Sequence, residues 1–224
     1  AFSNALSLSL SLDKRDFYFN PTSGYYLNQT AKFVGGPLGG EKHYVRTDSK
    51  VENFLTLLDV NITDSWRYRL VLGAHTQLSF IWPQFWVPSG YDHLTAGTAD
   101  LLWIDGMYIA RGWSRELDKR VIWDNWVELR MPLAERVVWF DLFFDMVGRW
   151  DTPSEFNEFK IQDFLFGYGG GLRFSIPQFP IRLYMVKRFE VNDSGKVNMK
   201  SGPLFRDSLG MDFVFSIGYE IFNQ

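Results

Sequence analysis

Residues 66–80 read WRYRLVLGAHTQLSF, and large apolar side chains alternate with small or polar ones along this stretch. One face carries Trp66, Tyr68, Leu70, Leu72, Ala74, Thr76, Leu78 and Phe80, and the other carries Arg67, Arg69, Val71, Gly73, His75, Gln77 and Ser79. A period of two indicates a β-strand whose two faces meet different surroundings. The segment is longer than strands of soluble domains usually are. It therefore predicts a long strand with one apolar face.

The same alternation recurs along the chain and predicts nine strands. They span residues 4–13, 24–34, 44–58, 66–81, 121–132, 137–149, 163–176, 181–190 and 211–222. Helical patterns are nearly absent. Strands of about ten residues, tilted by roughly 45°, are long enough to cross the core of a bilayer.

The connections between these strands alternate in length. Short ones lie at residues 20–24, 134–136 and 177–180, and long ones at 35–43, 82–120, 150–162 and 191–210. Short turns at one end and long loops at the other are typical of an outer-membrane barrel, with the short turns in the periplasm. Aromatic residues near the strand ends fit the girdles of such a barrel, and these are Trp66, Trp82, Trp150 and Tyr219. We therefore expect one antiparallel transmembrane β-barrel domain over residues 1–224.

Composition argues against several other classes of protein. The 224 residues are 18% aromatic, carry a net charge of −3 and include no cysteine, so nothing points to a nucleic-acid partner, a disulfide framework or a thiolate metal site. The histidines at 43, 75 and 93 lack metal-ligand spacing, and we expect no metal site and no cofactor. Asp141 and Asp145 share a face without a partnered nucleophile, so we expect structural charge and no enzymatic activity.

A soluble β-sandwich with one solvated face is the main alternative fold. The length of the strands argues against it, as does an apolar face that stays large and aromatic in strand after strand. Glycines at 167, 169, 170 and 171 alternate with outward aromatics, and they predict a strand bend or the close approach of a loop rather than a phosphate site.

A second pattern is the pentapeptide Ile109-Ala110-Arg111-Gly112-Trp113, late in the longest loop. The next two predicted strands carry Glu128 and Asp145 on their polar faces. A guanidinium has five donors in a fixed plane and can bridge two carboxylates, and burying it is costly unless it is paired. The pattern predicts that the loop folds back and that Arg111 meets both acids. A solvated loop arginine is the alternative.

With this motif, the chain resembles the carboxyl-terminal part of the barrel of BamA-type outer-membrane protein assembly factors, in the superfamily of POTRA-barrel bacterial surface antigens. The family motif is Val-Arg-Gly followed by Phe or Tyr, so Ala110 and Trp113 depart from it. Five further segments resemble the family in the same order, and they are 13–24, 128–133, 143–148, 169–182 and 213–218.

The resemblance implies roles for particular residues. Arg111, Gly112 and Trp113 would form a loop lock, with Glu128 and Asp145 as its partners in the lumen. The closing strand would form one side of a lateral gate through Phe213, Phe215, Ile217, Gly218 and Tyr219. An ordinary seam strand is the alternative. The implied function is insertion and folding of β-barrel proteins in the bacterial outer membrane. The implied partners are membrane lipids, unfolded outer-membrane protein clients and accessory assembly lipoproteins.

Length is where the chain departs most from the family. The family barrel has about sixteen strands, preceded by soluble POTRA domains, within the range known for bacterial barrels. This sequence shows nine predicted strands and no POTRA pattern, and we expect it to be the carboxyl-terminal part of the barrel. Two other functions stay open here, namely a two-partner-secretion-type exporter and a passive porin or adhesin.

Overall fold

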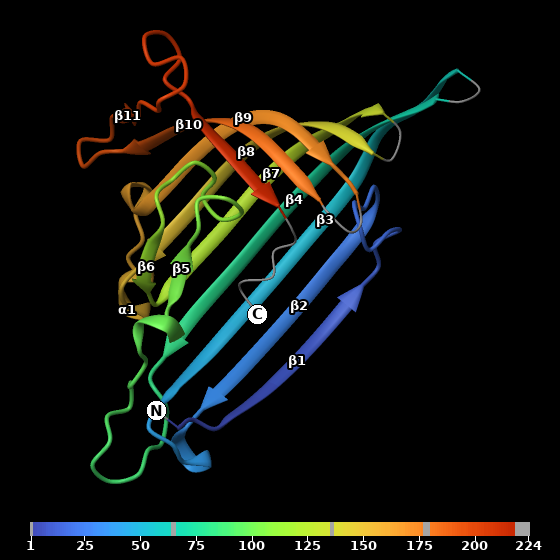
Figure 1. Cartoon of the computed structure of the whole chain (residues 1–224). Helices are drawn as coiled ribbons and strands as arrows, with labels where there is room; N and C mark the ends of the chain where they lie inside the picture. The colour runs from blue at the N-terminus through green and yellow to red at the C-terminus, as the bar shows by residue number, and fades with distance from the viewer. Residues whose placement is uncertain (1, 64–65, 135–136, 177–179, 218–224) are drawn as a thin grey trace.

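A computed structural model describes residues 2–63, 66–134, 137–176 and 180–217 of the chain. Its main feature is one ten-stranded sheet in the order β1-β2-β3-β4-β7-β8-β9-β10-β11, with β12 also paired to β10 (Figure 1). The long strands are β1 (Ala5–Asp13), β2 (Gly24–Val34), β3 (Tyr44–Thr63), β4 (Trp66–Trp82), β7 (Val121–Ala134), β8 (Val138–Trp150), β9 (Phe164–Phe174) and β10 (Ile181–Val191). Each pairs antiparallel with the next, which confirms the predicted fold class.

The remaining elements are short and lie in the connections. The strands are β5 (Leu102–Ile104), β6 (Glu116–Lys119), β11 (Val197–Met199) and β12 (Asp212–Ile217), and β5 and β6 form a separate two-stranded sheet. The helices are α1 (Pro153–Phe156) and the 3-10 turns η1 (Gly36–Leu38), η2 (Thr98–Asp100) and η3 (Ile161–Asp163). None of the described helices combines the length and apolarity needed to cross a membrane.

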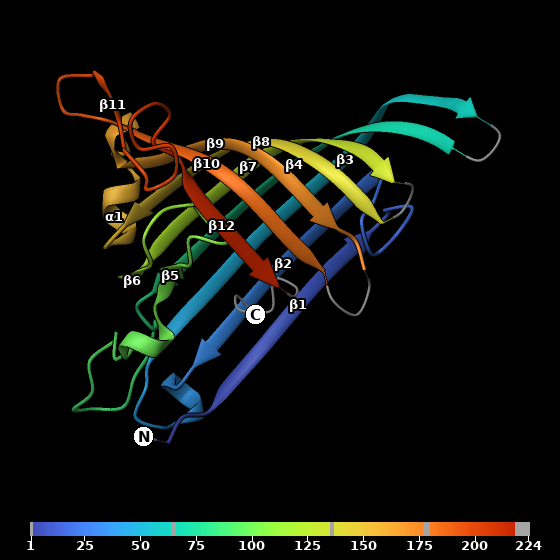
Figure 2. The same cartoon turned by 45° about the horizontal axis from the view of Figure 1, so that its top comes forward.

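The main sheet is curved (Figures 1 and 2). The side chains on its two faces differ sharply in exposure. On β12, Val214 and Ser216 are buried on the inner face, whereas Phe213 and Phe215 are 54% and 47% exposed on the outer face. The same outward exposure of large apolar side chains is found on β1, where Leu10 is 77% exposed. A sheet of this kind has an apolar outer surface and a covered inner surface, as the wall of a membrane barrel does.

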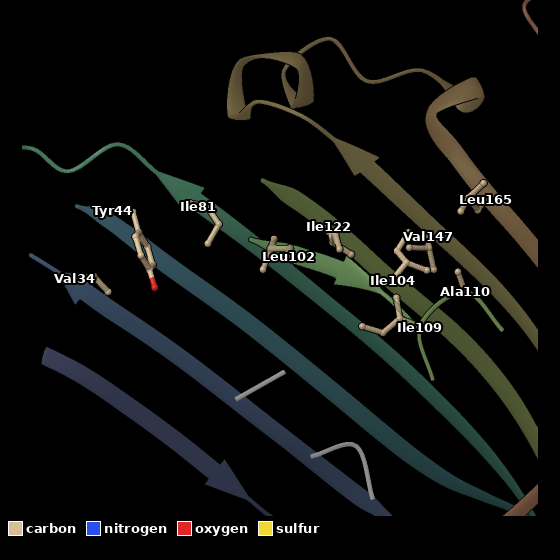
Figure 3. Close-up of a cluster of buried hydrophobic side chains, with 10 residues drawn as sticks. All are labelled: Val34, Tyr44, Ile81, Leu102, Ile104, Ile109, Ala110, Ile122, Val147 and Leu165. Carbon is tan, nitrogen blue, oxygen red and sulfur yellow. The ribbon is translucent and has the colours of Figure 1, made fainter. Parts of the chain in front are cut away.

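The long loop between β4 and β7 covers part of the inner face, whereas β1 is exposed along its whole length. Leu102 and Ile104 of β5, together with Ile109, pack in one buried cluster with Ile122 of β7 and Val147 of β8 (Figure 3). Ile104 and Val147 are completely buried. The loop is therefore a packed part of the structure and not a solvated excursion.

Two features differ from the sequence prediction. The longest loop was expected to lack strands, but it contains β5 and β6, because its apolar residues are buried against the inner face. β3 was expected to end at residue 58 and instead continues to Thr63. A register shift between Thr56 and Leu58 places an extra residue in the strand, and this interrupts the alternation from which the end was predicted.

One aromatic residue assigned to the girdle packs with outer-face residues but is covered and not exposed. Trp150 is only 4% exposed, because Phe156 of α1 and Phe164 of β9 pack on its ring at centroid distances of 5.0 and 5.6 Å. The carboxylate of Asp163 also accepts a hydrogen bond from its indole nitrogen at 3.1 Å. Trp150 is therefore part of a packed aromatic cluster, whereas Trp82 is 38% exposed at the end of β4.

The turn between β1 and β2 is organised by one carboxylate. Asp16 Oδ1 accepts backbone hydrogen bonds from Phe17 and Thr22 at 2.9 Å and from Ser23 at 3.1 Å. Its Oδ2 accepts a bond from the Thr22 hydroxyl at 2.5 Å. A single side chain thus satisfies three backbone donors that a turn would otherwise leave to water.

We expect this turn to loosen in acid. Burial alone would raise the pKa of Asp16, but the hydrogen bonds from Thr22, Ser23 and Phe17 hold that pKa below its usual value. Because the folded pKa is lowered, the carboxylate stabilises the turn above its unfolded pKa of about 3.9, and the stabilisation is lost as the pH falls through the lower folded pKa. Amide exchange at Thr22 and Ser23, corrected for intrinsic rates, should accelerate on acidification. In the Asp16→Ala variant it should be fast at every pH, and identical protection in the variant and the wild type would contradict this role.

Candidate functional site

The tip of the long loop is held in a fixed conformation before it reaches the sheet. Asp105 Oδ1 accepts backbone hydrogen bonds from Met107 and Tyr108 at 2.8 Å and from Ile109 at 2.9 Å. The loop then turns through Ala110 at φ 55° and Gly112 at φ 83°. A left-handed alanine is strained, and its side chain is buried, so the tertiary contacts of the tip must offset this strain.

This turn presents Arg111 to two carboxylates on the inner face. Its Nε and Nη2 donate to the two oxygens of Asp145 on β8 at 2.8 and 2.5 Å, and its Nη1 donates to Glu128 on β7 at 2.6 Å. The backbone nitrogen of Arg111 also donates to Asp145, at 3.3 Å. The structure therefore brings together the three residues that the sequence analysis paired.

The ion pairs of Arg111 are buried. Arg111, Asp145 and Glu128 are 3%, 2% and 6% exposed. The guanidinium also lies over the ring of Phe143, 3.6 Å from its centroid, where a cation is attracted to the aromatic face. Burial alone would lower the pKa of Arg111, but the carboxylates of Asp145 and Glu128 raise it well above its usual value, so the guanidinium stays charged.

The sequence analysis expected Asp141 to be a structural charge, but it missed Arg130 and the partners of Asp141 in this cluster. Arg130 Nε and Nη2 donate to Glu128 at 3.0 and 2.9 Å, on the side away from Arg111. Next to it, the carboxylate of Asp141 accepts hydrogen bonds from Arg173 at 2.8 Å and from the hydroxyl of Tyr184 at 2.6 Å. Strand parity was the available signal, because Arg130, Asp141 and Arg173 all fall on inward positions of adjacent strands.

The other two members of the loop motif contact the sheet beside this cluster. Trp113 donates its indole hydrogen to the carbonyl of Phe166 at 3.0 Å. A side chain on Gly112 would lie 3.2 Å from Val186 of β10, and one on Gly167 would lie 3.4 Å from the carbonyl oxygen of Arg111. Close approach of a loop was the role expected for the β9 glycines, and Gly167 has that role.

A second polar cluster faces the interior farther along the sheet. His75 of β4 lies between Glu52 of β3 and Asp124 of β7, with nitrogen to oxygen distances of 3.5 and 3.2 Å, and it stacks on Trp126 at 5.1 Å. The imidazole is therefore part of the interior lining, the position its strand parity predicted. It links three adjacent strands.

The closing strand is described only in part. Phe213, Phe215 and Ile217 are exposed on the outer face of β12, and their strand pairs with β10 from Ile181 to Val186. The other two residues assigned to the gate, Gly218 and Tyr219, lie outside the described residues. The structure therefore places three of the five residues assigned to the gate on the outer surface of β12.

An apolar outer surface, a charged interior and a loop fixed to the inner wall define part of an outer-membrane β-barrel. Residues 1–220 match the model of the Omp85 superfamily domain, so the chain belongs to the Omp85 superfamily and resides in the bacterial outer membrane. This confirms the resemblance found in the sequence. The outer apolar face of the sheet is therefore its lipid-facing surface.

The chain is also similar to a Treponema pallidum (strain Nichols) protein that is provisionally named an outer membrane protein assembly factor. The two are 31% identical over 209 residues, which cover 83% of this chain and 25% of that protein. The chain thus spans about a quarter of the length of this relative.

Removing the guanidinium should free the loop. Arg111→Ala leaves two buried carboxylates without their shared partner, a change that typically costs about 3–5 kcal/mol. We expect limited proteolysis of the folded full-length protein to cut the loop much faster than in wild type. Arg111→Lys should rescue only partly, because an ammonium has no planar fork for two carboxylates. Arg115→Ala removes an exposed arginine from the same loop and is the matched control. Equal cleavage rates in the Arg111→Ala and Arg115→Ala variants would show that Arg111 does not hold the loop on the sheet.

A substitution at Gly112 gives an independent test of how closely the loop tip packs on β10. Gly112→Ala forces a left-handed alanine, at a cost of about 1 kcal/mol, and brings its side chain against Val186. We expect intermediate protease sensitivity of the loop. The control is Gly195→Ala, since Gly195 also has a positive φ, of 76°, but a side chain there would meet nothing within 4 Å. If both variants were as resistant as wild type, close packing at Gly112 would not matter.

Proposed function

We propose that the full-length protein folds and inserts β-barrel proteins into the outer membrane, and that β12 forms one side of the seam where clients enter. The observation that carries this proposal is the buried contact of Arg111 with Asp145 and Glu128 in an Omp85 barrel wall. The similarity to the Treponema pallidum protein, which is named for outer membrane protein assembly, supports the same role.

The locked loop and the last strand would play complementary parts. The loop ties β7 and β8 together from the inside, so this part of the wall is rigid. In the described part of the chain, β12 pairs with β10 on one edge, and its outer side chains are apolar. A strand entering lipid must pair every backbone group, and an edge that opens offers those partners. Client strands would therefore add to the seam by edge pairing.

This activity would need neither a cofactor nor covalent chemistry. The free energy would come from burying the client's apolar surface in lipid and pairing its backbone. The clients would be unfolded outer-membrane proteins. Accessory lipoproteins and membrane lipids would be the other partners.

Crosslinking from the lipid-facing surface tests where clients enter. A photoreactive amino acid would replace Phe215 on β12 or, as a control, Leu27 on β2, which is also exposed on the outer face at 38%. We expect a radiolabelled client barrel, added during assembly, to be trapped at least several-fold more at position 215 than at position 27. Equal adducts at both positions would argue against a seam at β12.

The yield of folded client in the same assembly reaction tests whether the Arg111 contact matters for the proposed function. The Arg111→Ala variant should lower the yield of folded client while Arg115→Ala keeps it near wild type. An open pore in conductance measurements, with client levels unchanged after depletion, would instead point to export through the lumen.

A further inference from the structure

The β3–β4 hairpin extends beyond both of its neighbours. β2 pairs with β3 only from Tyr44 to Phe54, and β7 pairs with β4 only from Val71 to Phe80. Residues 55–63 and 66–70 therefore form a two-stranded ribbon that, within the described chain, has no third strand. Figures 1 and 2 both show it projecting past the ends of the adjacent strands. At about 3.3 Å per residue, its β3 arm is roughly 30 Å long.

This ribbon lies at the end of the sheet that carries the short turns, which is the periplasmic end of an outer-membrane barrel. Membrane barrels usually have only tight turns there. The ribbon is thus an extra surface on that side of the membrane.

The two faces of the ribbon differ in polarity. On the outer face, Leu58 lies opposite Leu70, and Val60 lies opposite Tyr68. Leu58 and Val60 are 45% and 38% exposed, and Leu55, nearer the base, is 55% exposed. The strand alternation of β4 continues without a break from the lipid-facing part of the wall into this face, so the apolar surface is one continuous sheet face.

The opposite face of the ribbon is polar, and two arginines share one carboxylate there. Asp59 lies opposite Arg69 and Asn61 lies opposite Arg67. Asp59 accepts hydrogen bonds from Arg67 at 2.5 and 2.7 Å and from Arg69 at 3.3 Å. Arg67 and Arg69 are therefore both paired with an acid of the ribbon itself.

The base of the ribbon is fixed in orientation by the β1–β2 turn. Arg69 Nη1 donates to the hydroxyl of Thr22 at 3.0 Å, and the hydroxyl of Thr56 donates to the carbonyl of Thr22 at 2.8 Å. Both bonds come from the polar side of the ribbon. They keep that side toward the barrel interior, so the apolar side stays turned outward.

We infer that this ribbon lies on the periplasmic leaflet of the outer membrane, with Leu58, Val60 and Tyr68 against phospholipid headgroups and upper acyl chains. Continuity with the lipid-facing wall identifies the membrane as the surface its apolar face meets. Trp66 and Tyr68, whose ring centroids are 6.3 Å apart, supply the aromatic side chains typical of the membrane interface.

The unpaired backbone edges of the ribbon limit how deeply it can lie in the membrane. Each outer edge of the ribbon carries backbone groups that lack a strand partner in the described structure, and such groups are not tolerated in the hydrocarbon core. At headgroup level, water and phosphate oxygens can pair with them. The ribbon therefore rests in the interface and does not cross the bilayer. The inference depends on membrane location and not on the insertase activity.

Fluorescent labels on opposite faces of the ribbon test this arrangement. The chain has no cysteine of its own, so a cysteine introduced at one position gives this chain a single labelling site. The full-length protein would carry the environment-sensitive probe NBD at Val60→Cys or Leu58→Cys on the apolar face. Asn61→Cys is the matched control on the polar face, one residue away. The variants would be reconstituted in vesicles of phosphatidylethanolamine and phosphatidylglycerol.

We expect the probe at positions 58 and 60 to emit at shorter wavelength than at 61. It should be quenched more than twofold better by lipids spin-labelled near the headgroup than by lipids labelled deep in the acyl chain. Iodide in the water should quench the probe at 61 and spare it at 58 and 60. Folding of each variant is checked by protease resistance of the Arg111 loop.

Two results would overturn the inference. Equal iodide quenching at 58, 60 and 61 would mean that the ribbon stands free in the periplasm. Shielding of positions 58 and 60 only after an unfolded outer-membrane protein is added would mean that the ribbon binds polypeptide. Because neither result measures client insertion, failure of this inference leaves the proposed function standing.

Discussion

The buried contact between the Arg111 guanidinium and the carboxylates of Asp145 and Glu128 is the constraint on which the interior of this structure depends. Three buried arginines, at 111, 130 and 173, meet three buried acids, at 128, 141 and 145, within one cluster. Removing Arg111 takes away the ion-pair partner of Asp145 and one of the two arginine partners of Glu128, so buried negative charge is left uncompensated. The wall alone supplies three acids and two arginines to this cluster. The loop supplies the third arginine, Arg111, which pairs with Glu128 and Asp145 and equalises the number of acids and arginines in the cluster.

The ion pairs of Arg111 fix where the loop contacts the sheet, and apolar packing holds the neighbouring part of the loop in place. Leu102, Ile104 and Ile109 pack with Ile122 and Val147 on the inner faces of β7 and β8 (Figure 3). This packing removes apolar surface from water. The resulting stability offsets the strained backbone at Ala110. Where the loop packs on β7 and β8, the space inside the sheet is occupied by protein.

The outer surface obeys a different constraint, since lipid accepts any apolar side chain but no unpaired backbone group. This explains why the outer faces of β1 and β12 show Leu10 and Phe215 without specific partners. The same constraint accounts for the location that we infer for the β3–β4 ribbon. The ribbon keeps the apolar face of the wall but loses the neighbouring strands, and the headgroup region is the environment that suits both properties.

Much of this architecture could be predicted from the sequence, because a period of two is a local property of the chain. Alternation around His75 and Asp145 assigned inner and outer faces correctly, and the turn residues assigned the two ends. The Arg-Gly-aromatic motif and the two inward acids predicted the central contact of the site. Alternation failed where a bulge adds a residue, and for this reason β3 ended too early in the prediction.

Tertiary structure decided what depends on distant parts of the chain. The short strands β5 and β6 form because the wall buries them, and nothing in the local pattern of residues 82–120 signals that burial. The partners of Arg130 and Asp141 follow from the register between strands, which parity alone does not specify. The sequence by itself determined which side of each strand meets lipid. Only the folded sheet decided which charges meet each other, since ion pairing depends on distances between residues far apart in the chain.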